Sequence, residues 1–193
     1  MPKKEEIKKV YNFVKNCKRC ILFKTRNNLV FGEGSLDSKI IFIGEAPGYN
    51  EDKQGRPFIG RAGKIFDELL DSINLKRNNV YITNILICRP PKNRKPLKNE
   101  INKCKKYLDK KIEIIKPNIF VPMGNIAASY ILKKFGIKND RISKIHGTIY
   151  QINYHSKIIK VIPLYHPAIA TYNINKRKIL FEDIKIIKKA LNK

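Results

Sequence analysis

The hydrophobic pattern of this chain consists of short continuous apolar runs separated by segments in which apolar residues recur every three or four positions. The continuous runs cover residues 40–43, 80–85, 119–122 and 158–164. Runs of this length without polar alternation predict strands that are buried on both faces. The periodic segments, which predict amphipathic helices, lie near residues 4–16, 65–73, 101–112, 126–131 and 176–191.

The order of these elements predicts the fold class. Strands that alternate with helices form a largely parallel sheet with helices packed on both of its faces. We therefore expect an α/β protein, a three-layer α/β/α sandwich around a central, mainly parallel four-stranded sheet. Residues 148–153 are expected to add a short strand or hairpin. We expect one domain over residues 1–193, because no repeat, linker or low-complexity tail interrupts the pattern.

The charge balance indicates a polyanionic partner. Lys and Arg total 41 and Asp and Glu total 16, which gives a formal net charge of +25, far from that of an ordinary enzyme surface. A genomic bias toward Lys, Ile and Asn codons is the alternative explanation, but it does not account for the scarcity of acids. Residues 89–98 and 103–111 concentrate the positive charge, which favours nucleic acid over a small anion.

Nothing in the sequence indicates a membrane partner or an export route. No apolar stretch approaches the length that spans a bilayer, and the N-terminal residues lead into an amphipathic segment. We expect an intracellular, cytoplasmic protein that associates with the nucleoid and is a monomer. Residues 188–193 contain no recognisable motif for binding a replication clamp, so clamp binding stays open.

Polar residues follow each predicted strand at the point where the strand ends. They are Glu45 after the first strand, Asn84 at the end of the second, Asn125 near the end of the third and His166 after the fourth. The carboxyl ends of parallel strands share one edge of the sheet, so these side chains should converge. Each one alone is more typical of a structural hydrogen bond, but together they predict a site.

These side chains suit the breaking of an N-glycosidic bond. An amide such as Asn84 offers a donor and an acceptor that match the edge of a base, and an aromatic ring such as Phe58 can stack on it. An imidazole can hydrogen-bond an oxygen that gains negative charge, and a carboxylate can position water or stabilise a cationic sugar. The alternative for Phe58 is a purely structural place in the core. The glycine-rich segment 54–63 around it lacks the Gly-Lys-Ser/Thr ending of a nucleotide-triphosphate loop.

Four cysteines predict a metal site. Cys17 and Cys20 form a C-x-x-C pair at the end of the first predicted helix, and Cys88 and Cys104 lie far downstream. Inside a cell, such a set favours thiolate-bound metal over disulfides. A closed zinc site and an iron–sulfur cluster each take four cysteines, and spacing alone does not choose between them. The alternative is that Cys88 and Cys104 are simply buried thiols.

Taken in order, the motifs resemble one family, the family 4 uracil-DNA glycosylases, which are the iron–sulfur type found in archaea and thermophilic bacteria. The resemblance covers nearly the whole chain. It rests on the two N-terminal cysteines and on GEAPG at 44–48, GRPFIGRAG at 55–63, YITN at 81–84, CRPP at 88–91, Cys104 and HPA at 166–168.

The resemblance implies a role for each of the candidate residues. The four cysteines would ligate a [4Fe–4S] cluster with a structural rather than redox role, with zinc as the less favoured occupant. In the base pocket, the backbone around Ala46 would touch the flipped base and Phe58 would stack on it. Asn84 would pair with N3–H and O4 of uracil, and His166 would hydrogen-bond O2. Glu45 would act on the hydrolytic water or on the sugar cation.

The function implied is hydrolysis of the N-glycosidic bond of deoxyuridine in DNA, which releases uracil and leaves an abasic site without cutting the strand. Uracil-containing DNA would be the partner. Residues 85–104 contain no His, unlike the related family that cross-links to DNA. A non-catalytic iron–sulfur or zinc nucleic-acid-binding module and a redox cluster protein are the alternatives from other classes.

One segment departs from the family pattern. After the HPA motif the family commonly continues with Leu-rich residues and an Arg that fill or hold the vacated duplex position. This chain reads IATYN at 169–173 instead. Ile169 and Tyr172 are therefore the two candidates for the wedge that would occupy the gap left by the flipped base.

Overall fold

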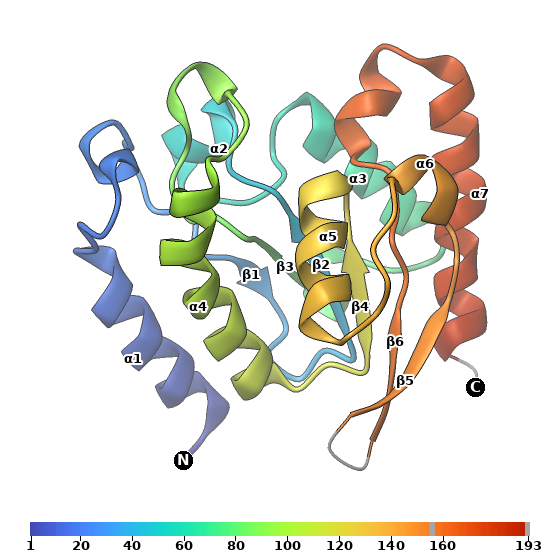
Figure 1. Ribbon diagram of the computed structural model, residues 1–193, viewed down its shortest axis with the longest axis horizontal. Coiled ribbons are helices and arrows are strands. Elements are labelled where there is room, and N and C mark those ends of the chain that lie inside the picture. The colour runs from blue at the N-terminus through green and yellow to red at the C-terminus, as the bar shows by residue number, and fades with distance from the viewer. Residues whose placement is uncertain (155–156, 192–193) are drawn as a thin grey trace.

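The computed structural model describes residues 1–154 and 157–191. Within these residues the centre of the molecule is a six-stranded sheet in the order β1-β3-β2-β4-β6-β5 (Figure 1). Its strands are β1 (Glu33–Gly34), β2 (Ile40–Gly44), β3 (Tyr81–Asn84), β4 (Ile119–Pro122), β5 (Tyr150–Tyr154) and β6 (Lys157–Val161). β3, β2, β4 and β6 run parallel to their neighbours, whereas β1 and β5 pair antiparallel at the two edges.

The predicted parallel four-stranded core is therefore confirmed, and two antiparallel edge strands complete a mixed sheet. β5 is the short strand expected near residues 148–153. β1 escaped prediction because a two-residue strand carries no periodic signal. β6 ends before the predicted strand does, because Pro122 on the β4 side and Pro163 on the β5 side have no N–H with which to continue its pairing. The chain nevertheless stays beside β4, where the Leu164 amide donates to the Pro122 carbonyl at 3.0 Å.

Helices cover both faces of the sheet, as Figure 1 shows for α4 and α5 in front of it and α3 behind it. The helices are α1 (Lys3–Lys15), α2 (Tyr49–Gln54), α3 (Arg61–Ser72), α4 (Lys98–Ile115), α5 (Asn125–Lys134), α6 (Ile142–Ile145) and α7 (Ile174–Leu191). Short 3-10 turns are η1 (Ile21–Lys24), η2 (Arg77–Asn79), η3 (Pro91–Asn93) and η4 (Pro167–Thr171). The five predicted helices are confirmed, whereas α2 and α6 are too short to show helical periodicity.

Two aromatic contacts mark the two faces of the sheet. Phe42 of β2 packs edge-on against Phe66 of α3, with ring centroids 5.1 Å apart. Phe120 of β4 packs in the same way against Phe135 at the end of α5, at 4.8 Å. Phe42 pairs in register with Val121, the neighbour of Phe120, so the two phenylalanines point to opposite faces. The three-layer α/β/α architecture follows from this alternation.

This arrangement brings the loops that follow the parallel strands to one edge of the sheet. The loop after β2 leads directly into α2, and the loop after β3 leads through η3 into α4. The segment after β6 leads into η4, which packs against both α3 and α7. Among the described residues, no helix is both long and apolar enough to cross a membrane.

Candidate active site

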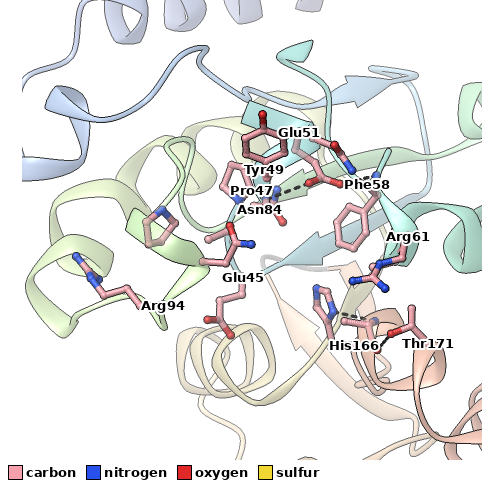
Figure 2. Close-up of a pocket in the computed structure, with 18 residues that line it drawn as sticks. Glu45, Pro47, Tyr49, Glu51, Phe58, Arg61, Asn84, Arg94, His166 and Thr171 are labelled. Atoms are coloured by element: carbon pink, nitrogen blue, oxygen red, sulfur yellow. Dashed lines mark hydrogen bonds between the residues drawn. The ribbon is translucent and has the colours of Figure 1, made fainter. Parts of the chain in front are cut away.

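A cavity of about 500 Å³ opens at the carboxyl edge of the parallel strands (Figure 2). Its walls come from the loop after β2, the start of α2, the loop before α3, the end of β3, the loop before α4 and η4. All five residues predicted to act on substrate line it, namely Glu45, Ala46, Phe58, Asn84 and His166. The structure thus brings together side chains that are up to 121 positions apart in the sequence.

Asn84 ends β3 at the back of this cavity. It is 2% exposed, and its Oδ1 has no hydrogen-bond partner, the one such buried side-chain atom among the described residues. Leaving a buried acceptor unsatisfied costs about 1–3 kcal/mol. An unpartnered amide oxygen at a cavity wall is typical of a group that meets its partner in a ligand.

Phe58 belongs both to the core and to the cavity wall. It is 5% exposed, and its ring lies 5.2 Å from that of Phe66 and 5.6 Å from that of His166, centroid to centroid. Its backbone has φ of +52°, a left-handed conformation that costs a residue with a side chain about 1–2 kcal/mol. The core packing expected as the alternative is therefore real, and it presents the ring to the cavity.

Gly44 allows Asn84 and Phe58 to meet. A Cβ added at this position would lie 2.2 Å from Asn84 Oδ1 and 2.5 Å from the Phe58 ring. Both distances are far below van der Waals contact, so any side chain would displace the amide or the ring. The glycine at the start of the GEAPG motif is thus required by packing across the strand end.

His166 is the N-cap residue of η4 and faces the cavity near Arg61 (Figure 2). The backbone N–H of Ala168 donates to His166 Nδ1 at 3.2 Å. A neutral ring that accepts at Nδ1 carries its proton on Nε2, which leaves a donor for a ligand. Burial lowers the pKa of His166 to about 4, because desolvation disfavours the imidazolium, so the ring is neutral at physiological pH.

Glu45 follows β2 directly and lies across the cavity from Phe58 and Arg61 (Figure 2). Its pKa is raised above the ordinary value, mainly because partial burial desolvates the carboxylate, while the positive charge of Lys95 acts in the opposite direction. A carboxylate that is partly removed from water interacts more strongly with nearby charge than an exposed one does.

Glu51 is a residue of the site that the sequence analysis missed. Its buried carboxylate accepts from the backbone N–H groups of Gly48 at 3.1 Å, Ile59 at 2.9 Å and Gly60 at 2.8 Å. It therefore ties the loop after β2 to the loop that carries Phe58. The spacing of Gly48 and Glu51 matches an N-terminal capping box, which was the available sequence signal.

The loop between β3 and α4 supplies the polar rim, which the sequence analysis also missed. Asn93 lines the cavity in a left-handed conformation with φ of +55°, and Arg89 Nε donates to its Oδ1 at 2.7 Å. Arg94 lines the same rim and forms a bidentate ion pair with Glu100. The clustering of cations in residues 89–98 pointed to nucleic acid without indicating which of them reach the cavity.

The two wedge candidates differ in exposure. Ile169 is half-buried and packs against the hydrophobic core, whereas Tyr172 is 78% exposed at the end of η4. Thr171, the residue before it, lines the cavity. Of these two candidates, only Tyr172 has a largely solvent-exposed side chain beside the cavity mouth.

The four cysteines line a second, smaller cavity between the N-terminal segment, the loop after β3 and α4. None of them forms a disulfide. Tyr107 Oη lies 3.2 Å from Cys17 Sγ, and Arg26 Nη1 donates to Cys88 Sγ at 3.2 Å. Burial raises the pKa of Cys104 to about 12, so a bound metal would have to displace its proton.

The chemistry of this donor set fits a group bound by four thiolates. Neither carboxylate nor imidazole lines the cavity beside Cys17, Cys20, Cys88 and Cys104. Among the described residues, no three potential ligands are arranged to hold a single metal ion. Zinc requires four ligands on one ion, whereas a [4Fe–4S] cluster takes one thiolate on each of four separated irons.

Comparison with known proteins assigns the class to which this fold and site belong. The model of the uracil DNA glycosylase superfamily matches residues 31–187, which include the cavity residues named above together with Cys88 and Cys104. The chain belongs to the uracil DNA glycosylase superfamily.

Several proteins similar to this chain are type-4 uracil-DNA glycosylases. That of Sulfurisphaera tokodaii is 47% identical over 185 residues, which are 95% of this chain and 84% of the relative. That of Saccharolobus solfataricus is 46% identical over 93% of this chain and 83% of its own length. That of Archaeoglobus fulgidus is 42% identical over 95% and 92%. The resemblance to family 4 drawn from the motifs is confirmed.

Proposed function

We propose that this uracil-DNA glycosylase breaks the N-glycosidic bond of deoxyuridine in the 500 Å³ cavity at the carboxyl edge of the sheet. The observation that carries the proposal is the buried, unpartnered Oδ1 of Asn84 beside the rings of Phe58 and His166. The products are free uracil and an abasic site in an intact strand. An enzyme that works on a base in a duplex must first rotate the nucleotide out of the stack.

Asn84 recognises the base through hydrogen bonds. Its Oδ1 has no hydrogen-bond partner among the described residues and is therefore available to a donor on the base. The oxygen then accepts N3–H of uracil, and the amide N–H donates to O4. Cytosine has an acceptor at N3 and a donor at C4, so the same amide orientation rejects it. Phe58 provides the ring on which the base stacks, and the backbone at Ala46 borders the pocket.

His166 stabilises the leaving base. Its Nε2–H, free because Nδ1 accepts from Ala168, donates to uracil O2 as negative charge develops there. The lowered pKa keeps the ring neutral, so it hydrogen-bonds the anion without transferring a proton to it at physiological pH.

Glu45 acts on the sugar side of the bond. The glycosidic bond breaks with positive charge developing on the sugar, and a partly desolvated carboxylate stabilises that charge. We propose that the same carboxylate also orients the water that adds to the sugar carbon. Its position across the cavity from Phe58 puts it on the far side of a base stacked on that ring.

Positive side chains at the rim bind the DNA backbone. Arg61 and Arg94 line the cavity, and Lys95 acts on the charge of Glu45. With a formal net charge of +25, the chain attracts phosphates over a wide surface. Tyr172 is the side chain proposed to fill the gap in the stack, because an exposed aromatic can insert between base steps.

Cys17, Cys20, Cys88 and Cys104 are proposed to hold a [4Fe–4S] cluster. The four-thiol lining of one cavity supports this proposal, with zinc as the alternative occupant. When bound, the cluster would supply a covalent crosslink between the N-terminal segment, the loop after β3 and α4. Iron and sulfide analysis with an absorption spectrum distinguishes the two metals.

The test is incubation of the protein with matched single-stranded oligonucleotides that carry uracil, cytosine or thymine at one position. Uracil should be released from the first oligonucleotide alone, with an alkali-labile site and no direct strand break. Asn84→Asp should lose or broaden this selectivity, whereas the surface variant Asn139→Asp should retain it. Equal discrimination by wild type and Asn84→Asp would contradict the role of Asn84.

A further inference from the structure

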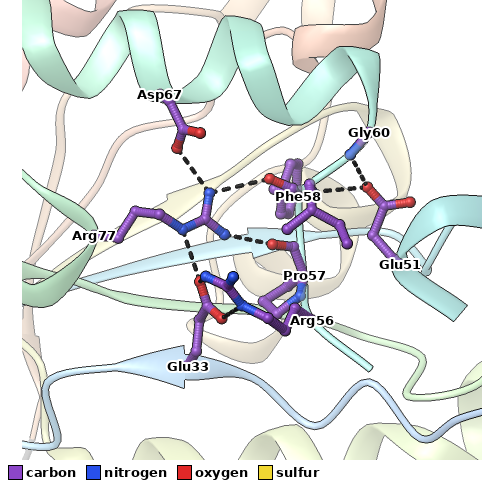
Figure 3. A network of polar contacts seen from close by, with 9 residues as sticks. Glu33, Glu51, Arg56, Pro57, Phe58, Gly60, Asp67 and Arg77 are labelled. Atoms are coloured by element: carbon purple, nitrogen blue, oxygen red, sulfur yellow. Dashed lines mark hydrogen bonds and ion pairs between the residues drawn. The ribbon is translucent and has the colours of Figure 1, made fainter. Parts of the chain in front are cut away.

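The loop that carries Phe58, residues 57–60, is held by side chains that take no part in the proposed chemistry. Phe58 adopts a left-handed backbone conformation that a residue with a side chain rarely occupies without support. Its ring must nevertheless keep one orientation if a base is to stack on it. The source of that support is visible in the polar contacts around the loop (Figure 3).

Arg77 of η2 lies beside this loop and donates to its backbone. Nη1 donates to the Phe58 carbonyl at 3.0 Å, and Nη2 donates to the Pro57 carbonyl. The guanidinium also lies over the ring of Phe66, 5.7 Å from its centroid, and Phe66 in turn packs against Phe58. One side chain therefore contacts both the backbone of the loop and the aromatic layer behind its ring.

Two carboxylates fix the guanidinium itself. Glu33 accepts from Arg77 Nε at 2.7 Å, and Asp67 of α3 accepts from Nη1 at 2.7 Å. The planar guanidinium therefore donates to four acceptors at once, two backbone carbonyls and two carboxylates. The single ammonium group of a lysine does not reproduce this geometry. Arg56 also pairs with Glu33, at 2.8 Å, but its side chain is 56% exposed.

The other side of the loop is equally fixed. Glu51 accepts from the amides of Ile59 and Gly60, so the loop's carbonyls are held by a cation and its amides by an anion. A Cβ at Gly63 would lie 2.0 Å from the Phe58 carbonyl oxygen, which shows how closely α3 approaches the same backbone. The loop thus has little freedom to shift while Arg77 and Glu51 remain in place.

We propose that Arg77 is a positioning residue of the uracil site, which holds residues 57–60 so that the Phe58 ring presents its face to the base. This assignment rests on the proposed stacking role of Phe58. Arg77 is not among the residues that line the cavity, so its effect on uracil must pass through the loop.

The experiment compares Arg77→Lys with the control Arg56→Lys, each in the wild-type background and in a Phe58→Ala background. The readouts are the inhibition constant of free uracil, and kcat and KM for uracil release from a single-stranded oligonucleotide. Stacking on an aromatic ring contributes about 1–3 kcal/mol per base, roughly a 5- to 150-fold change in affinity. Arg77→Lys should therefore weaken inhibition by uracil about tenfold, and Arg56→Lys less than twofold.

In the Phe58→Ala background, Arg77→Lys should cause no further loss of uracil affinity. An unchanged inhibition constant for Arg77→Lys, or an equal loss with and without Phe58, would overturn the positioning role. If Phe58→Ala alone leaves uracil inhibition unchanged, the stacking role fails first and the assignment of Arg77 fails with it. If Arg77→Lys does not fold, Asp67→Asn replaces it, with an expected two- to threefold loss that again depends on Phe58.

Discussion

Replacing Asn84 with leucine should make the free enzyme more stable and abolish its activity. Leucine has nearly the shape of asparagine but no polar atoms, so Asn84→Leu removes the unpartnered acceptor without creating a cavity. The unsatisfied oxygen costs about 1–3 kcal/mol in the folded state. The leucine methyl groups press more closely on Gly44 and on the Phe58 ring, which offsets part of this gain.

The net expectation is an increase of about 1 kcal/mol in the free energy of unfolding, within the range for an unsatisfied buried group. For a chain of this length it corresponds to a rise of about 2–4 °C in Tm. Uracil at 100 times its Kd should stabilise the wild type by about 2.7 kcal/mol and leave Asn84→Leu unchanged. Release of uracil from DNA should fall more than 100-fold, because the base edge then loses both of its hydrogen-bond partners.

Chemical denaturation with and without uracil measures both effects on the same samples. Asn139→Leu on the surface serves as the control, with an expected change below about 0.5 kcal/mol. A loss of more than 1 kcal/mol in Asn84→Leu would refute the reasoning, since it would mean that the amide is satisfied in the free enzyme. Stabilisation of Asn84→Leu by uracil would refute the assigned role in base recognition.

Two further predictions follow from charge and a third from the exposure of Tyr172. Because burial raises the pKa of Glu45, activity should fall as the pH drops through a value above the ordinary range of glutamate, and the weak activity of Glu45→Gln should lack this step in a pH–rate profile. Lys111 is fully buried, donates to Thr83 Oγ1 at 2.7 Å, and has a pKa lowered by desolvation to about 7. Since the unfolded chain keeps this proton up to about pH 10, the contribution of Lys111 to the free energy of unfolding of the metal-free protein should rise by roughly 3–4 kcal/mol between pH 7 and 10. The difference in free energy of unfolding between the wild type and Lys111→Met, measured by denaturation at both pH values, should change by this amount. Tyr172→Ala should weaken cleavage of double-stranded uracil DNA at least fivefold and leave single-stranded cleavage nearly unchanged, and equal effects on both substrates in parallel assays would exclude it as the wedge.

The core of the fold could be predicted because continuous apolar runs and helical periodicity are strong local signals. Strands β2, β3, β4 and β6 and all of the long helices appear in the pattern of apolar positions. Of the two edge strands, β5 forms a hairpin with the neighbouring β6 and was expected, whereas β1 depends on pairing with the distant β3 and has only two residues. The early end of β6 depends on the missing backbone donors of Pro122 and Pro163, which matter only once the neighbouring strands are known.

The site could be predicted only in part. Glu45, Asn84 and His166 stand directly at strand ends, where the topology of a parallel sheet brings side chains together. Glu51, Asn93 and Arg77 act through hydrogen bonds to backbone or side-chain atoms of loops, and those contacts exist only in three dimensions. The sequence likewise could not reveal that Phe58 is both a core residue and a cavity wall.

The most direct test of the site is a crystal structure of the protein with free uracil bound. The base should lie against the Phe58 ring, with N3–H and O4 on the amide of Asn84 and O2 on Nε2 of His166. The Glu45 carboxylate should lie on the side from which the sugar would enter. Uracil bound elsewhere, or in this cavity without contact to Asn84 and His166, would contradict the assignment of the active site.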